Sequence, residues 1–195
     1  MGGLLTLAAL ALCAAVPVAA AAEPVSEVRG RLVGDRIFPA VVYLATASGP
    51  PAAAAERATM KQMHLRFVPQ VLPVVVGTTV DFVNVDEMNH NVFSPSARPF
   101  DLGTFGSGAR AHVFTEPGAH IILCNVHVEM VGWVLALATP YFASTDKEGA
   151  FVLRVPPGHH RLSVWRPRVP EDSRVVDVAA GSVAQVEWDL AEKWP

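Results

Sequence analysis

The feature that most constrains this chain is an alternation of apolar and polar residues with period two, which runs from Val25 almost to the C-terminus. Such alternation is typical of β-strands with one buried face. Because many short segments of this kind follow one another, the sequence predicts an all-β sandwich or barrel. The segments are 26–33, 39–46, 64–69, 71–76, 78–84, 91–96, 110–115, 119–124, 131–137, 150–155, 160–167, 174–179 and 183–190.

Turn residues separate these segments, for example at Gly103–Gly108 and at Pro156–Gly158. One segment, 51–63, departs from the pattern with the sequence PAAAAERATMKQM. Its alanines favour helix, but it lacks an apolar stripe along one face. We therefore predict a loop there, with room for one helical turn.

The first 22 residues carry no charged side chain and end in small residues, with Ala20 and Ala22 placed as a cleavage site before Glu23. This pattern is typical of a secretory signal peptide, although no Lys or Arg stands near the start. The apolar run is too short for a comfortable membrane span, and no other stretch is long enough. We expect an exported protein, periplasmic if the source is a Gram-negative bacterium.

The charge of the chain is mild, with a formal net charge of −3. Basic runs and interleaved basic and aromatic residues are absent, so nucleic acid is not an expected partner. A Ser-His-Asp pattern with supporting context is also absent, and we do not expect an enzyme. The oligomeric state stays open.

Removal of the signal peptide would leave Cys124 as the only cysteine. A lone cysteine in an exported protein is a free thiol, an intermolecular bridge or a metal ligand. An oxidising compartment threatens an unprotected thiol, and metal ligation would protect it.

Two further soft or borderline ligands follow Cys124 in the segment 124-CNVHVEM-130, namely His127 and Met130. Thiolate, imidazole and thioether together are the ligands of blue-copper sites, which need a second imidazole. His90, just after the strand pattern 78–84, is the best candidate. Each residue also has an ordinary alternative: a buried small thiol, a surface turn histidine, or a methionine in the core.

The segments 90-HNVF-93, 124-CNVHVEM-130, 77-GTTVDFVNVD-86 and 117-PGAHIILC-124 resemble the cupredoxin family. The ligand spacing is closest to the short loop of amicyanins, and the context is similar to exported methylamine-utilisation proteins. The resemblance implies a Greek-key β-sandwich with one copper ion. It implies His90, Cys124 and His127 as equatorial ligands, Met130 as the axial ligand, and Asn91 holding the ligand loops together by side-chain hydrogen bonds. Val128 stands where such loops often have proline.

The flanking segments 29–45 and 145–165, followed by 174–181, resemble the two parts of a carboxypeptidase-regulatory-like β-sandwich. We therefore expect a cupredoxin sandwich that is inserted in, or packed with, a second small β-sandwich. The expected division is a signal peptide at 1–22, first strands of the second sandwich at 23–48, a cupredoxin domain at 57–142 and the remaining strands at 143–195.

The predicted function is that of a one-electron carrier that cycles between Cu(I) and Cu(II), with Val131 and Trp133 offering a docking patch for a redox partner protein. Two alternatives stay open. One is copper storage or delivery, which Met60, Met63 and Met88 favour because thioethers suit Cu(I). The other is a structural or binding β-sandwich with a vestigial metal site.

Overall fold

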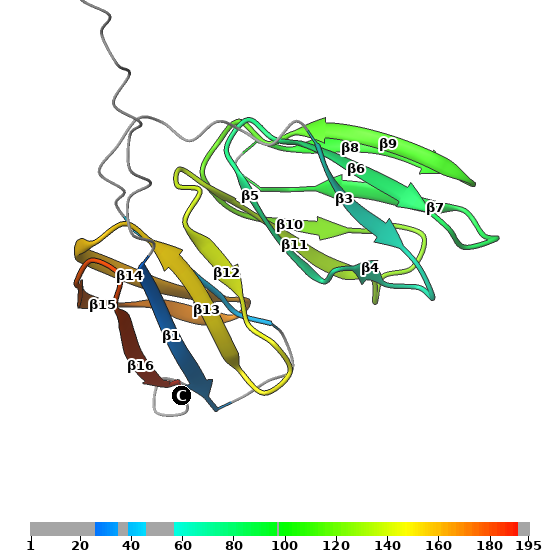
Figure 1. Cartoon of the computed structure of the whole chain (residues 1–195). Helices are drawn as coiled ribbons and strands as arrows, with labels where there is room; N and C mark the ends of the chain where they lie inside the picture. The colour runs from blue at the N-terminus through cyan, green and yellow to red at the C-terminus, as the bar shows by residue number, and fades with distance from the viewer. Residues whose placement is uncertain (1–25, 35–38, 46–56, 97, 191–195) are drawn as a thin grey trace, which may run out of the picture.

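The computed structural model describes residues 26–34, 39–45, 57–96 and 98–190. Within these ranges every regular element is a β-strand, so no helix suited to a membrane span is found there. The expected signal peptide lies outside the described residues. The strands build two β-sandwiches that lie side by side (Figure 1).

The segment from residue 57 to 137 folds into a four-stranded and a five-stranded sheet, with strand orders β4-β3-β6-β9 and β5-β11-β10-β7-β8. The chain crosses repeatedly between these sheets, as in a Greek key. The strands are β3 (Arg57–Gln62), β4 (Phe67–Val68), β5 (Val71–Val75), β6 (Thr79–Asn84), β7 (His90–Ser94), β8 (Phe100–Phe105), β9 (Gly108–Val113), β10 (Gly118–Leu123) and β11 (Val131–Leu137).

The second sandwich combines strands from both flanks of that segment, in sheets with orders β13-β1-β16 and β12-β2-β14-β15. The predicted fold class, an all-β chain with a Greek-key sandwich joined to a second small sandwich, is confirmed. The strands are β1 (Ser26–Val33), β2 (Val41–Leu44), β12 (Phe142–Ser144), β13 (Ala150–Val155), β14 (Gly158–Arg166), β15 (Val169–Val178) and β16 (Val183–Asp189).

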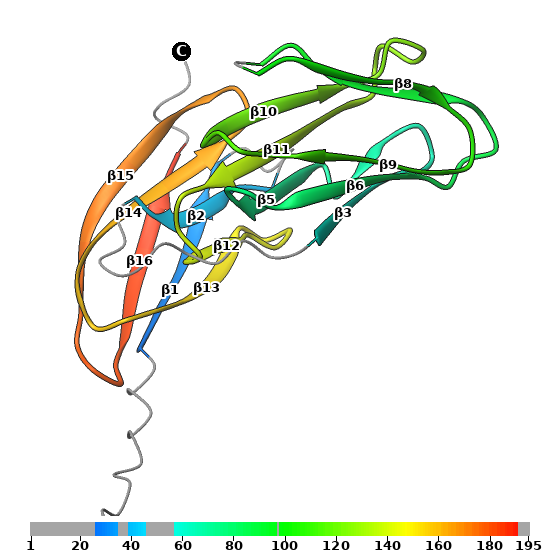
Figure 2. The same ribbon diagram turned by 90° about the horizontal axis from the view of Figure 1, so that it is seen from above.

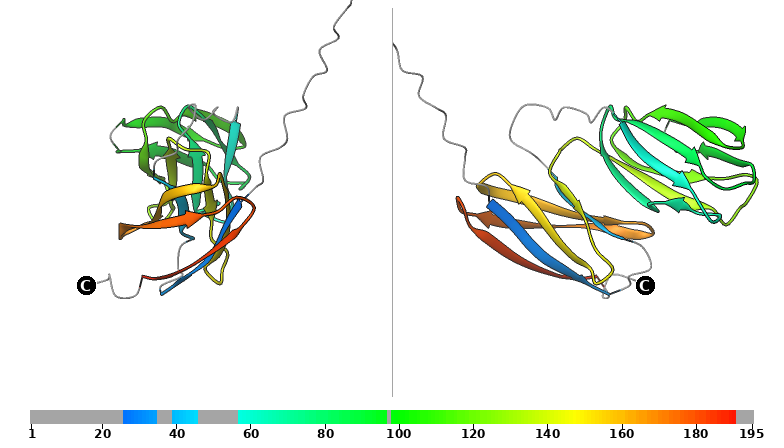
Figure 3. Two further views of the ribbon diagram at one scale, coloured as in Figure 1. Left: turned by 60° about the vertical axis from the view of Figure 1, so that its left-hand side comes forward. Right: turned by 45° about the vertical axis from the view of Figure 1, so that its right-hand side comes forward.

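Each sandwich has its own core. One cluster, which includes Phe67, Phe82 and Ile122, lies between the two sheets of the first sandwich. Another cluster surrounds Trp188 in the second sandwich. A third cluster joins the two sandwiches, with Trp133 of β11 packed among apolar residues of the five-stranded sheet and of the sheet that contains β2 and β14. Figures 2 and 3 show the two sandwiches next to one another in further views.

The prediction of a loop over 51–63 is wrong for its last part, because Arg57–Gln62 forms β3 in parallel with β6. Its inward residues are Met60 and Gln62, both fully buried. Strand β8 was not predicted either, since Gly103 was taken as a turn residue. It lies within the strand with φ of 73°, where the register against β7 shifts, as at a glycine-containing β-bulge.

Candidate metal centre

The ligand loop connects two paired strands of the five-stranded sheet. Cys124 follows the last residue of β10 and Met130 precedes the first residue of β11, while Leu123 pairs with Val131 across the two strands. Leu123 also pairs with Phe93 of β7. The first residue of β7 is His90. The pairing of β7 with β10 therefore brings His90 to the same end of the sheet as the loop.

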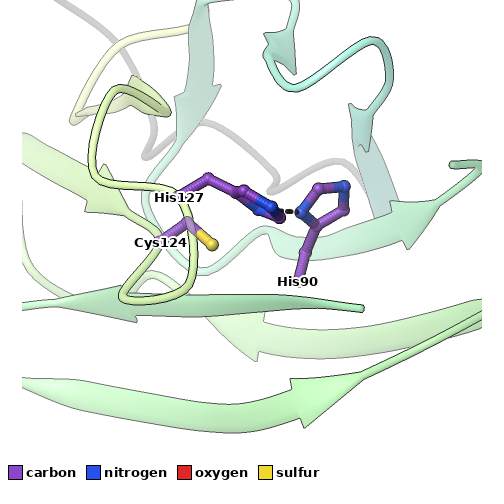
Figure 4. Close-up of side chains that lie close together, drawn as sticks. All are labelled: His90, Cys124 and His127. Atoms are coloured by element: carbon purple, nitrogen blue, oxygen red, sulfur yellow. Dashed lines mark hydrogen bonds between the residues drawn. The ribbon is translucent and has the colours of Figure 1, made fainter. Parts of the chain in front are cut away.

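His90, Cys124 and His127 form a group whose ligand atoms all lie within 4.8 Å of one another. Figure 4 shows the two imidazole rings turned toward one another, with the Cys124 sulfur beside them. The Nδ1 atoms of His90 and His127 are 3.1 Å apart. Among the described residues this is the one such group of His, Cys, Asp and Glu side chains.

The opposite edge of the His90 ring contacts Asp86, since Nε2 lies 2.9 Å from Oδ2 of that residue. Burial raises the pKa of the Asp86 carboxyl. The N–H groups of His64 and Leu65 and the His90 imidazole outweigh this effect, and the net pKa lies below the ordinary value. Asp86 is thus an ionised acceptor at neutral pH. The Nε2 atom of His90 must donate to it, which leaves the Nδ1 lone pair of a neutral His90 free to face the group.

A hydrogen bond between the two Nδ1 atoms requires a proton on one of them. With the proton of a neutral His90 on Nε2, the donor in such a bond is His127 Nδ1 and the acceptor is His90 Nδ1. A metal ion held by both Nδ1 atoms would require the His127 proton to lie on Nε2 instead. It would also require Cys124 as a thiolate, so metal binding would release the thiol proton and would weaken in acid.

The Cys124 sulfur is buried and accepts a hydrogen bond from the main-chain N–H of Asn91, at 3.3 Å. This hydrogen bond helps to hold the sulfur beside the two imidazoles. Among the described residues, the Asn91 side chain makes no hydrogen bond to the ligand loop, which differs from the role that the sequence resemblance implies. Its Nδ2 donates to Oδ1 of Asp101 at 2.7 Å, within the β7–β8 pair, because Asn91 faces that neighbouring strand.

Met130 is buried in the same apolar cluster as Cys124, with an exposed fraction of 1%. Its main-chain N–H donates to the carbonyl of His127 at 3.0 Å, so the loop folds back on itself. The next strand begins close to Phe67: a Cβ atom on Gly132 would stand 2.8 Å from the Phe67 Cβ. Gly132 thus permits the close approach of β4 to the base of the loop.

The three side chains fit a soft or borderline transition metal ion. Two nitrogen ligands at about 2.0 Å from a tetrahedrally bound ion lie about 3.3 Å apart, close to the 3.1 Å between the two Nδ1 atoms. Two imidazoles and one thiolate are the equatorial donors of blue-copper sites, and they also suit zinc. The donor set therefore fits copper without excluding zinc.

The candidate ligands differ in exposure. His90 is fully buried, whereas His127 is half-buried at the surface between Val126 and Val128, whose exposed fractions are 46% and 83%. The predicted docking patch at Val131 and Trp133 is wrong. Trp133 is buried in the cluster that joins the two sandwiches, and Val131 packs against that cluster.

Two other histidines that the sequence placed in strands lie in β9 and β10. The His112 ring stacks on Phe100 at 3.8 Å between centroids, and His120 meets Phe114 edge to face at 5.1 Å. The predicted set of site residues also lacked Asp86, whose carboxylate contacts Nε2 of His90 on the ring edge opposite Nδ1. The signal was present in the sequence as an acidic residue four positions before the histidine, in 86-DEMNH-90.

No protein-family model and no curated relative matches the chain. Part of the chain matches several solved structures. An oxidised mutant of amicyanin is 24% identical over 42% of this chain and 83% of that chain, with a TM-score of 0.40. A purple cupredoxin from Nitrosopumilus maritimus is 26% identical over 41% and 99%, with a TM-score of 0.38. A copper-containing nitrite reductase from Thermus scotoductus SA-01 is 25% identical over 56% and 28%, with a TM-score of 0.41.

Proposed function

We propose that this chain is an exported mononuclear type 1 copper protein and acts as a one-electron carrier. The observation that carries the proposal is the buried thiol of Cys124 beside the converging imidazoles of His90 and His127. We assign these three residues as equatorial ligands and Met130 as the weak axial ligand. Bound copper would supply a Cu(I)/Cu(II) couple whose potential the axial ligand and the apolar surroundings tune.

The residues around the ligands limit rearrangement on electron transfer. His90 is held by Asp86, and Cys124 is held by the Asn91 N–H. Apolar residues enclose the Cys124 and Met130 side chains and exclude water. A site held in one geometry serves both oxidation states, which favours a carrier of single electrons.

The electron would leave through His127, the half-buried ligand. The surface at this end carries exposed apolar side chains on the ligand loop, Val126 and Val128, and on the loop before His90, Val85 and Met88. Exposed apolar side chains on these two loops suit transient contact with a redox partner protein. This surface replaces Trp133 as the proposed docking patch.

Copper storage or delivery remains the second candidate, since it uses the same ligands. Its support is weaker than the sequence indicated, because Met60 is fully buried in the core and cannot receive copper from solution. Exposed Met88 still favours it. The rate of electron self-exchange, compared with the rate of copper transfer to a chelator, distinguishes a carrier from a delivery protein.

We propose that the copper domain comprises residues 57–137, shorter than the predicted 57–142 because Phe142 already belongs to β12 of the second sandwich. We propose that segment 23–48 and the chain from β12 to residue 195 form the regulatory-like sandwich. We also propose a periplasmic or other exported location, and no enzymatic activity, since four protein ligands leave no open position for a substrate. A structural β-sandwich with a vestigial metal site is the third candidate, and a failure to bind copper would favour it.

The deciding experiment adds Cu(II) to the purified metal-free protein and records the visible and electron paramagnetic resonance spectra. An intense thiolate-to-copper band with a narrow hyperfine splitting is the expected result. Cys124→Ser is the matched control, because it removes the thiolate and keeps the imidazoles. A colourless complex in the wild type, or an unchanged spectrum in Cys124→Ser, contradicts the proposal. Elemental analysis of protein purified without added metal separates copper from zinc.

A further inference from the structure

The turn between β3 and β4 has an unusual backbone for its sequence. Met63 and Arg66 exchange two main-chain hydrogen bonds, of 2.9 and 3.2 Å, across the pair His64–Leu65. Both central residues have positive φ, 54° and 59°. A two-residue hairpin turn of this kind normally has Asn-Gly or a similar pair. A residue with a Cβ atom is disfavoured in this conformation by about 1–2 kcal/mol.

The N–H groups of this turn both point at one carboxylate. His64 donates to Oδ1 of Asp86 at 2.7 Å, and Leu65 donates to Oδ2 at 3.1 Å. The same Oδ2 accepts the Nε2–H of His90 at 2.9 Å. Asp86 thus connects two strained turn residues to a metal-site imidazole through a single side chain.

The main chain around Asp86 is also fixed by the last residues of β3 and β6. The N–H of Val85 donates to the Gln62 carbonyl at 3.0 Å, and the N–H of Asp86 donates to Oδ1 of Asn84 at 3.0 Å. The carboxylate can therefore turn only about its own side-chain bonds. The two N–H groups of the turn remove that remaining freedom.

We infer that the His64–Leu65 turn is a positioning element for the metal site, which it orients through Asp86 and His90. This inference rests on the proposed function as far as copper is concerned. The turn fixes the carboxylate, the carboxylate fixes the proton on His90 Nε2, and the Nδ1 lone pair then faces Cys124 and His127. Backbone strain that persists beside a functional site is consistent with this role. Neither turn residue belongs to the ligand group.

The test inserts two glycines between His64 and Leu65, which keeps every side chain of the site but moves the two N–H groups. The matched control is the double variant His64→Asn with Leu65→Gly, which keeps a two-residue turn and both donors without the strain. Nitrogen-15 spectra of the metal-free protein should show His90 with its proton on Nε2 in the wild type and in the control. The insertion should give mixed tautomers and a copper affinity at least about tenfold lower, as for other residues that orient metal ligands.

An unchanged His90 tautomer together with an unchanged copper affinity in the insertion variant overturns the inference. If that variant does not fold, Asp86→Asn is used, since it replaces one accepting oxygen with a donor. Mixed tautomers are expected there, and a single Nε2–H tautomer contradicts the inference. If the wild type binds no copper, the proposed function fails, while the tautomer measurement still decides whether the turn positions His90.

Discussion

The Nδ1 atoms of His90 and His127 face one another at 3.1 Å across a separation of 37 residues in the chain. The planes of the two rings make an angle of 67°, and the ring centroids are 4.9 Å apart. They reach the site from different environments. His90 is fully buried and hydrogen-bonded to Asp86, whereas His127 stands at the surface in a loop with exposed neighbours.

This difference predicts different outcomes when each ring is removed. In His127→Gly the vacated space opens to solvent, because Val126 and Val128 beside it are exposed. Free imidazole added to the copper-loaded variant should enter and restore the thiolate-to-copper band. In His90→Gly the space is enclosed, so the same imidazole should restore little. Visible titrations of both variants make the comparison. Equal rescue, or an intact band in His127→Gly without imidazole, would show that His127 is not the surface ligand.

Met130→Leu tests the axial ligand. The substitution nearly conserves volume in a buried position, so the free energy of unfolding should fall by less than about 1.5 kcal/mol. Copper should still bind through the three equatorial ligands, and the band should remain. The reduction potential should rise, because the more highly charged Cu(II) loses a donor in an apolar site. Redox titration gives the result, and an unchanged potential would remove Met130 from the ligand set.

Trp133→Ala tests the cluster between the two sandwiches. Deleting a buried large aromatic side chain typically lowers the free energy of unfolding by about 3–5 kcal/mol, and denaturant titration should show such a loss. The copper spectrum should change little. Val175→Ala is the control, since Val175 is 66% exposed and its loss should shift stability by no more than about 0.5 kcal/mol. Unchanged stability with slower electron transfer to a partner would restore Trp133 to the docking patch.

The grouping of His90, Cys124 and His127 was predictable from the sequence, because two of them share one short loop and the third follows a clear strand. Asp86 was less visible, since an acidic residue near a histidine is common at a protein surface. The turn at His64–Leu65 was not predictable, because its residues disfavour positive φ, and contacts with the distant Asp86 help to hold them there.

The strands were predictable where apolar residues alternate, since each sandwich buries one face of every sheet. Strand β3 escaped prediction because one of its inward residues is polar: Gln62 is buried and donates through Nε2 to the Asn91 carbonyl at 3.1 Å. The role of Trp133 depends on contacts with residues of the second sandwich that are distant from it in the sequence. Alternation alone does not show which face of a strand packs against a second sandwich.

The last prediction concerns His112, which lies away from the metal site. Burial, and to a smaller extent the nearby His120, lowers the pKa of His112 below its ordinary value of 6.5. The ring stacks on Phe100 and lines a cavity that also includes Arg98, Glu116 and His120. Since the unfolded chain takes up the proton at the higher pKa, protonation favours unfolding. The free energy of unfolding should therefore fall as the pH decreases through 6.5 toward the folded-state pKa of His112.

His112→Phe keeps an aromatic ring on Phe100 and removes the titrating group. Between neutral pH and a pH of about 5, the metal-free variant should lose less stability than the wild type, because the other ionisable groups are common to both. Denaturant titration at the two pH values gives the difference, and proton spectra of the wild type should show His112 titrating below 6.5. An equal loss of stability in the two proteins, with His112 titrating at or above its ordinary pKa, would mean that the ring is solvated in the folded protein.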